Sequence, residues 1–161
     1  MSDGLASVAV YCLIPVGILG LLVAHELGHA LPVLLAGGRA HVTVGSRDGR
    51  TATLGRFSVT VGAPGLRRLL TYGEIAWSGV DSNRVRAAAI LGGPAVTASA
   101  IGVLGLVLSG GVDGPSFWVV ANLLVGESYR LYQTAVPKTY SRGPYEGMPS
   151  DGKRFLRLVR S

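Results

Sequence analysis

The chain has 161 residues, enough for one domain, with 48% hydrophobic and only 15% charged residues. Ordinary globular domains contain about 25% charged residues, so this composition indicates a membrane protein. The net charge of +6 does not indicate nucleic acid, because the basic residues avoid the apolar runs, which is typical of loops that flank membrane spans. Nucleic acid is therefore not an expected partner.

The first predicted element is a helix over residues 5–36. Residues 5–24 contain no charged side chain, and twenty helical residues extend about 30 Å, enough to cross the hydrocarbon core of a bilayer. The apolar character continues to the Gly37-Gly38 pair, which predicts the end of the helix. Only Asp3 precedes the run, so it lacks the basic start of a secretory signal peptide, and we expect it to be retained.

Residues 39–82 are predicted to form a small β insert. Polar and apolar residues alternate over 41–44 and 58–61, a period typical of strands. Residues 51–54 and 70–77 are also predicted as strands, and turn-forming residues separate the segments. We expect a small antiparallel sheet or a pair of hairpins.

Two further helices are predicted, over residues 86–109 and 116–136. The first has 23 residues without charge, from residue 87 onward, and is long enough to span a membrane. The second is uncharged only as far as Glu127, so it spans a bilayer if Glu127 and Arg130 face a polar interior or lie at the boundary.

The basic residues predict the orientation of the chain. Residues 39–86 contain eight Arg and three acids, and the chain from residue 128 contains seven Lys and Arg, six of them in the polar tail 137–161. Since cytoplasmic loops collect Lys and Arg, three spans place both basic segments in the cytoplasm. The predicted fold class is a membrane α-helical protein of about three transmembrane helices, with a small β-sheet between the first two.

The candidate site is residues 25–29, His-Glu-Leu-Gly-His, within the most apolar part of the chain. On a helix His25 and His29 lie one turn apart on the same face, so both imidazoles can bind one Zn²⁺ at about 2.0–2.1 Å. Glu26 can reach water at the metal without being a ligand, which is the HExxH pattern of a metalloprotease. Ionisable groups are costly in apolar surroundings, so we expect a functional site rather than a packing motif.

A hydrolytic zinc site needs a third protein ligand and an open position. Leu35 stands where the extended motif would have a third His, and the nearest acid after the motif is Asp48, in a predicted turn. His41 begins a predicted strand and is expected to be a surface residue rather than a ligand. The candidate that remains is Asp151, between Ser150 and Gly152.

The chain resembles the site-2 protease family of intramembrane zinc metalloproteases, in particular its minimal bacterial branch. The matching segments are AHELGHAL at 24–31, the LLAGG that follows, Asn122-Leu-Leu, and Ser150-Asp-Gly152 before an apolar segment. The resemblance implies that Asp151 completes the zinc site and that Asn122 lines the catalytic cleft. It also implies a bacterial cell-membrane protein, and the basic segments place the motif end of the first helix, and with it the site, on the cytoplasmic side. Because 28 residues separate Asn122 from Asp151, the tail must fold back to reach the metal.

The function predicted from these observations is an intramembrane metalloprotease with Zn²⁺ as cofactor. Its expected partners are the lipid bilayer and a membrane-protein substrate, cleaved in or near a transmembrane segment; the sequence gives no oligomeric state. A strand edge within residues 40–63 is predicted either to bind the unwound substrate or to serve as a structural cap. Three alternatives stay open: a non-proteolytic membrane protein with metal-binding or regulatory roles, a soluble metalloprotease domain, and a membrane protein without metal.

Overall fold

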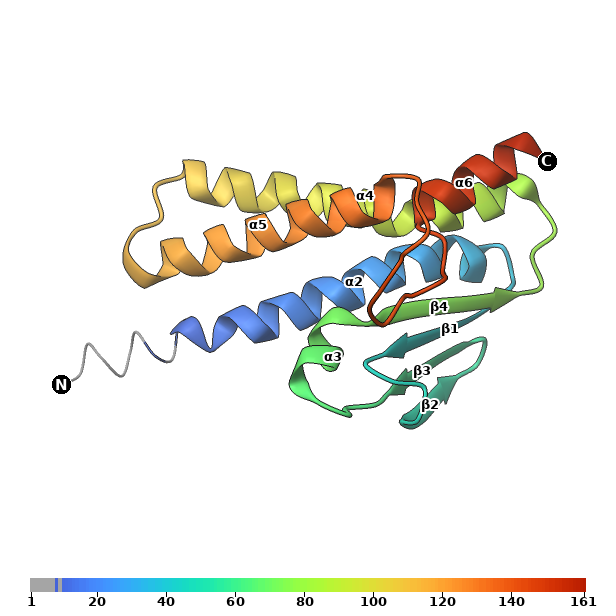
Figure 1. Ribbon diagram of the computed structural model, residues 1–161, viewed down its shortest axis with the longest axis horizontal. Helices are drawn as coiled ribbons and strands as arrows, with labels where there is room; N and C mark the ends of the chain where they lie inside the picture. Colours follow the sequence, from blue (N-terminus) through green and yellow to red (C-terminus); the bar gives the residue numbers. More distant parts are fainter. Residues whose placement is uncertain (1–7, 9) are drawn as a thin grey trace.

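The computed structural model describes Val8 and residues 10–161, so residues 5–7 and 9 of the first predicted helix lie outside the described part. Three long helices, α2, α4 and α5, lie side by side, and a four-stranded sheet packs against the second half of α2 (Figure 1). A shorter helix, α6, follows a loop that turns back from the end of α5 (Figure 1). The molecule is thus mostly helical with a small sheet between its first two long helices.

The long helices lie close to the predicted ranges. Helix α2 covers Leu13–Leu35, α4 covers Asn83–Ser109 and α5 covers Gly114–Ala135. Helix α2 ends just before Gly37, whose φ of 87° is in the left-handed region that favours glycine.

Within the described residues, α2 and α4 are long and apolar enough to cross a membrane, and α5 is not among such helices. Of the three expected spans, two therefore meet this criterion of length and composition, and the third does not. The difference arises because α5 includes Glu127 and Arg130 together with several polar side chains, which lower its mean hydropathy.

The sheet consists of β1 (Arg39–Val44), β2 (Arg50–Leu54), β3 (Phe57–Val61) and β4 (Gly73–Ser78), in the order β2-β3-β1-β4. The pairs β2–β3 and β1–β4 are antiparallel, but β1 and β3 are parallel. The expectation of an antiparallel sheet was therefore wrong in one pairing. The β2–β3 hairpin docks as a unit, and it places its second strand, not its first, beside β1.

The predicted strand over residues 70–77 was wrong at its start. Helix α3 (Leu66–Thr71) occupies this part, and β4 begins only at Gly73. Apart from Thr71 the segment Leu-Arg-Arg-Leu-Leu-Thr has no β-branched residue, and the Thr71 hydroxyl donates to the Arg67 carbonyl one turn earlier (2.8 Å). Local helical hydrogen bonds therefore prevail over the apolar character that suggested a strand.

The core lies between α2 and the sheet. The fully buried Val33 of α2 packs with Val42 and Val44 of β1 and with Ile75 of β4. These β-branched side chains fit the pleated surface of a sheet and leave α2 fixed against it. Both β1 and β4 contact α2, and β4 is an edge strand, so one edge of the sheet lies beside this helix (Figure 1).

Helices α2 and α4 cross at unusually close range because glycine faces glycine. A Cβ atom on Gly28 would lie 2.5 Å from the Gly92 carbonyl oxygen, and one on Gly92 would overlap the Gly28 carbonyl group. Small residues permit such close helix contacts. The crossing lies within residues 25–29, so it positions the candidate site.

We predict that Gly92→Ala lowers the midpoint of thermal unfolding in detergent, because overpacking typically costs about 1–3 kcal/mol. Gly102→Ala, on the same helix with no described atom within 4 Å of the new methyl group, is the matched control. We expect it to leave the midpoint unchanged or raise it, since Ala favours a helix over Gly by about 1 kcal/mol. Equal responses of the two variants would contradict the close crossing.

Candidate metal centre

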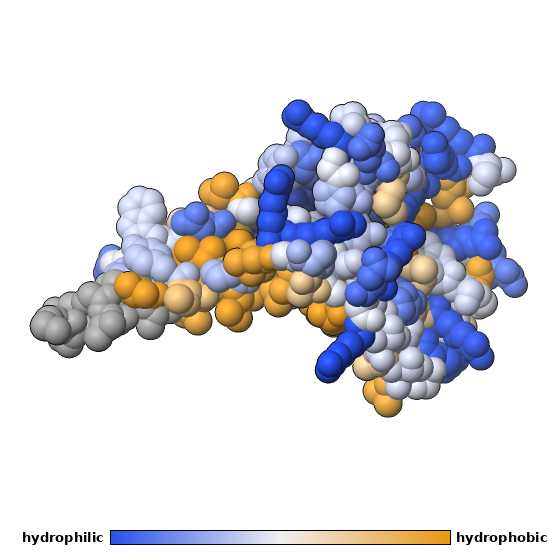
Figure 2. Space-filling view, turned by 60° about the horizontal axis from the view of Figure 1, so that its bottom comes forward, coloured by the Kyte–Doolittle hydropathy of each residue, from blue (hydrophilic) through white to orange (hydrophobic). Residues whose placement is uncertain are grey.

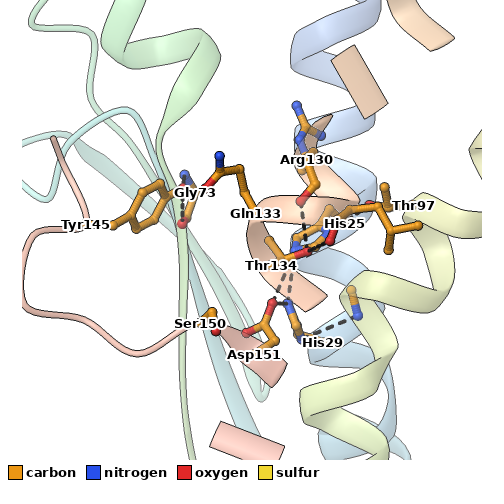
Figure 3. Close-up of polar contacts among 12 residues, drawn as sticks. His25, His29, Gly73, Thr97, Arg130, Gln133, Thr134, Tyr145, Ser150 and Asp151 are labelled. Atoms are coloured by element: carbon orange, nitrogen blue, oxygen red, sulfur yellow. Dashed lines mark hydrogen bonds and ion pairs between the residues drawn. The ribbon is translucent and has the colours of Figure 1, made fainter. Parts of the chain in front are cut away.

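His25, His29 and Asp151 come together in a buried cluster, two from α2 and one from the first residue of α6 (Figure 3). The two Nε2 atoms are 3.2 Å apart. The Asp151 Oδ2 atom lies 3.5 Å from Nε2 of His29 and 3.8 Å from Nε2 of His25. Three potential ligand atoms from distant parts of the chain therefore face one point.

These separations suit a single metal ion. Donors that each lie about 2.0–2.1 Å from a tetrahedral zinc are about 3.3–3.4 Å from one another. The distances of 3.2, 3.5 and 3.8 Å lie around that value without any large rearrangement. Two imidazoles and one carboxylate, with a further position open, are also the donor set of hydrolytic rather than structural zinc sites.

Helix α4 orients both imidazoles through their other nitrogen. Nδ1 of His29 lies 2.7 Å from the Ala89 carbonyl oxygen. Because a carbonyl only accepts, this Nδ1 carries the proton, and the Nε2 lone pair is left to face the cluster. Nδ1 of His25 lies 2.8 Å from the Thr97 hydroxyl oxygen (Figure 3).

Gly93 gives α4 the space to reach His29. A Cβ atom at this position would overlap the His29 ring at Nε2. In the sequence, the Gly92-Gly93 pair is consistent with a close helix contact, but it is equally consistent with general packing of small residues. The structure gives Gly93 a specific role, since any side chain there displaces a metal-facing imidazole.

The tail folds back as the spacing required, and Ser150 closes the returning loop. The Ser150 N–H donates to the Lys138 carbonyl (2.9 Å), and its hydroxyl donates to the Val136 carbonyl (2.7 Å). The same hydroxyl accepts from the Lys138 N–H (3.0 Å) and caps α6 by accepting from the Lys153 N–H (3.3 Å). Ser150 thus joins the end of α5 to the start of α6 and places Asp151 in the cluster.

Gly152 lets α6 (Asp151–Arg160) approach the end of α5, because a Cβ atom there would overlap the Ala135 carbonyl group.

Burial by itself would raise the pKa of Asp151, but hydrogen bonds and charge interactions with His25 and His29 outweigh burial and hold that pKa below its usual range. The helix N-terminus also favours a carboxylate here. Asp151 is therefore available as an ionised ligand.

Glu26 lies beside the cluster at the wall of a cavity of about 1010 Å³, which His25, His29 and Asp151 also line. The side chain is buried, with 5% of its surface exposed. A Cβ atom at Gly73, the first residue of β4, would overlap the Glu26 carboxylate. The strand and the candidate general base are therefore in close contact, and only glycine permits it.

Tyr145, in the loop before α6, occupies the free edge of β4 at this point. Its hydroxyl oxygen accepts from the Gly73 N–H (2.7 Å) and lies 2.8 Å from the Gly73 carbonyl oxygen, to which it can donate. Its ring stacks on Tyr72 at 5.1 Å between centroids. Burial raises the pKa of Tyr145, so the phenol stays protonated. Nothing in the sequence indicated this contact, which joins residues 72 positions apart.

Asn122 is not brought to the cluster. Its side chain is exposed, its amide donates to the Trp118 carbonyl one turn earlier in α5 (2.7 Å), and it is not among the residues that line the cavity. The expected role of Asn122 in the cleft therefore finds no support in this geometry. The adjacent Leu123, on a different face of the same helix, lines the cavity instead.

His41 also lies apart from the cluster, as expected. Its Nδ1 is 2.6 Å from the Ser58 hydroxyl and its Nε2 is 3.2 Å from the Thr60 hydroxyl, both on β3. Both ring nitrogens thus have partners within the sheet. His41 therefore serves as a control histidine that is hydrogen-bonded but distant from the candidate metal ligands.

Comparison with known proteins gives no match to this chain: no family model, no curated protein and no solved structure is similar to it. Its site is therefore interpreted from its own geometry. The structure describes a buried His, His and Asp cluster that can hold a metal ion, with a carboxylate beside it at a cavity wall.

We predict that the detergent-purified protein binds one divalent transition-metal ion per chain, measured as metal content after dialysis. His29→Ala and Asp151→Ala each remove a donor atom and should lose the ion or bind it far more weakly. His41→Ala, the matched control, should retain it. Retention in Asp151→Ala would exclude Asp151 as a ligand.

Proposed function

We propose that the protein is an intramembrane zinc metalloprotease of the site-2 type, which hydrolyses a peptide bond in or near a transmembrane segment of a membrane protein. The main support is the buried cluster of His25, His29 and Asp151 with Glu26 beside it at the cavity wall. A structural metal site needs no such additional carboxylate, whereas hydrolysis needs a general base next to an open position.

In this proposal His25, His29 and Asp151 would hold a zinc ion, which when bound would lower the pKa of water at the site and polarise the peptide carbonyl. Glu26 accepts the proton of the attacking water as its oxygen bonds to the carbonyl carbon. The C–N bond then breaks, and Glu26 returns the proton to the departing amine nitrogen. The low exposure of Glu26 limits competing bulk water and strengthens its interaction with the site.

The location in a membrane is supported by α2 and α4, and we propose α5 as a third span beside them. Hydrophobic side chains gather along the helices, whereas hydrophilic ones gather around the sheet and α6 (Figure 2). In α5 the buried Glu127 pairs with Arg130 (Oε1 to Nη1, 3.0 Å), so these charges face the interior of the bundle. The basic sheet and tail lie on the cytoplasmic side in this proposal.

The substrate segment must be extended, because a helical carbonyl is already hydrogen-bonded. We propose that it pairs with the free edge of β4, rather than with an edge within residues 40–63. Residues Gly73, Glu74 and Ile75 of β4 line the cavity. In contrast β2, the other edge strand, lies on the far side of the sheet (Figure 1).

We predict that Glu26→Gln retains zinc but lowers cleavage by a factor of about 10²–10⁴, the usual contribution of a general base. The probe is a single-span membrane protein with a helix-breaking Asn-Pro-Gly sequence in its span, reconstituted with the enzyme in liposomes and followed by gel electrophoresis. The control is Glu146→Gln, at an exposed position in the loop before α6, which should cleave normally.

Cleavage by Glu26→Gln at the wild-type rate would contradict the role assigned to Glu26. A wild-type protein that holds zinc but leaves several such probes intact would favour the non-proteolytic alternative.

We predict that Tyr145→Phe lowers the KM for the same probe. The substitution frees the Gly73 N–H and C=O groups for the substrate, and two hydrogen bonds of about 0.5–1.5 kcal/mol each correspond to about 5- to 150-fold. Tyr132→Phe, at an exposed position, is the control. A loss of kcat in Tyr145→Phe would instead assign the phenol a direct part in the reaction.

A further inference from the structure

Thr97 of α4 holds one of the two candidate metal-binding imidazoles. Its hydroxyl oxygen is 2.8 Å from Nδ1 of His25, and the two residues are 1% and 3% exposed (Figure 3). When Nε2 of His25 faces a metal, Nδ1 carries the ring proton, so Thr97 accepts this hydrogen bond. The hydroxyl proton of Thr97 then needs a hydrogen-bond acceptor, because buried polar groups are hydrogen-bonded. A buried water molecule would itself need polar partners, so we look for the acceptor among the side chains.

Glu127 of α5 is the acceptor in reach. Its side chain is 2% exposed on α5, which packs against α4, and its carboxylate lies near enough to the Thr97 hydroxyl to interact with it, although no hydrogen bond between the two is formed in the described geometry. Its Oε1 atom pairs with Arg130, whereas Oε2 is buried without a hydrogen-bond partner among the described residues. An unpartnered buried carboxylate oxygen costs free energy, so its position requires an explanation.

The neighbouring residue Ser99 shows the usual arrangement on a helix. Its hydroxyl donates to the carbonyl of Ala95, one turn earlier (2.9 Å). Such bonds satisfy a hydroxyl proton locally and leave it unavailable to other side chains. Thr97 faces His25 and Glu127 instead, so its hydroxyl can join two side chains from different helices.

We propose that Glu127 and Thr97 are positioning residues that hold His25 for a divalent metal ion. The His25 Nδ1–H donates to the Thr97 oxygen, and the Thr97 O–H donates to Oε2 of Glu127. Arg130 pairs with the Glu127 carboxylate and holds it in place. The relay fixes the tautomer and ring orientation of His25 and makes its Nε2 a stronger donor, as a carboxylate does when it binds a metal-ligating histidine directly.

This inference rests on the metal centre of the proposed function but not on proteolysis. It also gives a reason for the charged residues Glu127 and Arg130 in α5. These charges help to make α5 the least apolar of the three long helices. A carboxylate that completes a hydrogen-bonded chain to the metal centre must be buried, and an arginine one turn away reduces the cost of burying it.

The test is a titration of the full chain in detergent with Co²⁺, whose visible absorption reports the geometry of its ligands. Thr97→Val, which keeps the shape but removes the hydroxyl, and Glu127→Gln should each weaken Co²⁺ binding about 10- to 100-fold and shift the absorption bands. Thr97→Ser should bind within a few-fold of the wild type. The control Ser99→Ala should have no effect.

Wild-type affinity and spectrum in Thr97→Val would overturn the proposal. Equal weakening in Thr97→Ser and Thr97→Val would also overturn it, because Thr97→Ser keeps the hydroxyl, so its loss of affinity would show that the hydrogen bond is not what supports His25. Unchanged binding in Glu127→Gln would remove Glu127 from the relay. Since no cleavage is measured, a protein that binds Co²⁺ as expected but cleaves nothing would contradict the proposed function and leave this inference intact.

Discussion

The close crossing of α2 and α4 is the constraint on which the site depends. Gly28 and Gly92 bring the two backbones into contact, and Gly93 leaves room for the His29 ring. At this distance α4 presents the Ala89 carbonyl and the Thr97 hydroxyl to the two imidazoles. A larger separation would leave both Nδ1 atoms without partners and the rings free to rotate, and the metal-facing Nε2 atoms would lose their fixed positions.

A second constraint is the return of the tail. Asp151 joins a helix that lies far from it in sequence, so the loop between α5 and α6 must close at a defined point. Ser150 provides that closure through hydrogen bonds to Val136 and Lys138, and Gly152 permits the close approach of α6 to α5. Each position of the Ser-Asp-Gly segment therefore has a physical role. Ser150 closes the loop, Asp151 places a carboxylate in the buried cluster, and Gly152 permits the close contact of α6 with α5.

Much of the helical architecture and three residues of the cluster could be predicted from the sequence. Charge-free runs indicated α2 and α4 because a helix needs a minimum apolar length to cross a bilayer. The His25 and His29 spacing indicated a shared ligand, since i and i+4 positions lie on one helix face. Asp151 remained as a candidate once nearer residues were excluded, but its role as a ligand followed only from a family resemblance, because a surface turn and a metal ligand have the same local sequence.

The remainder depends on contacts between distant segments, which local patterns do not encode. The parallel pairing of β1 with β3 arises from how a hairpin docks, and the contact of Tyr145 with Gly73 arises from how a loop returns. Asn122 illustrates the converse: a shift of one residue, about 100° around the helix, decides whether a side chain lines the cavity, and a short matching segment does not fix that rotation. The roles proposed for Thr97 and Glu127 likewise depend on the packing of α4 between α2 and α5, which brings Thr97 to His25.

The most direct test of the account is X-ray absorption at the zinc edge of the zinc-loaded protein, compared with Asp151→Asn. The account predicts two imidazole nitrogens and oxygen donors at about 2.0–2.1 Å, no sulfur, and a changed oxygen shell in the variant while the imidazole signal stays. A zinc surrounded only by oxygens, or the same spectrum in both proteins, would contradict a centre formed by His25, His29 and Asp151.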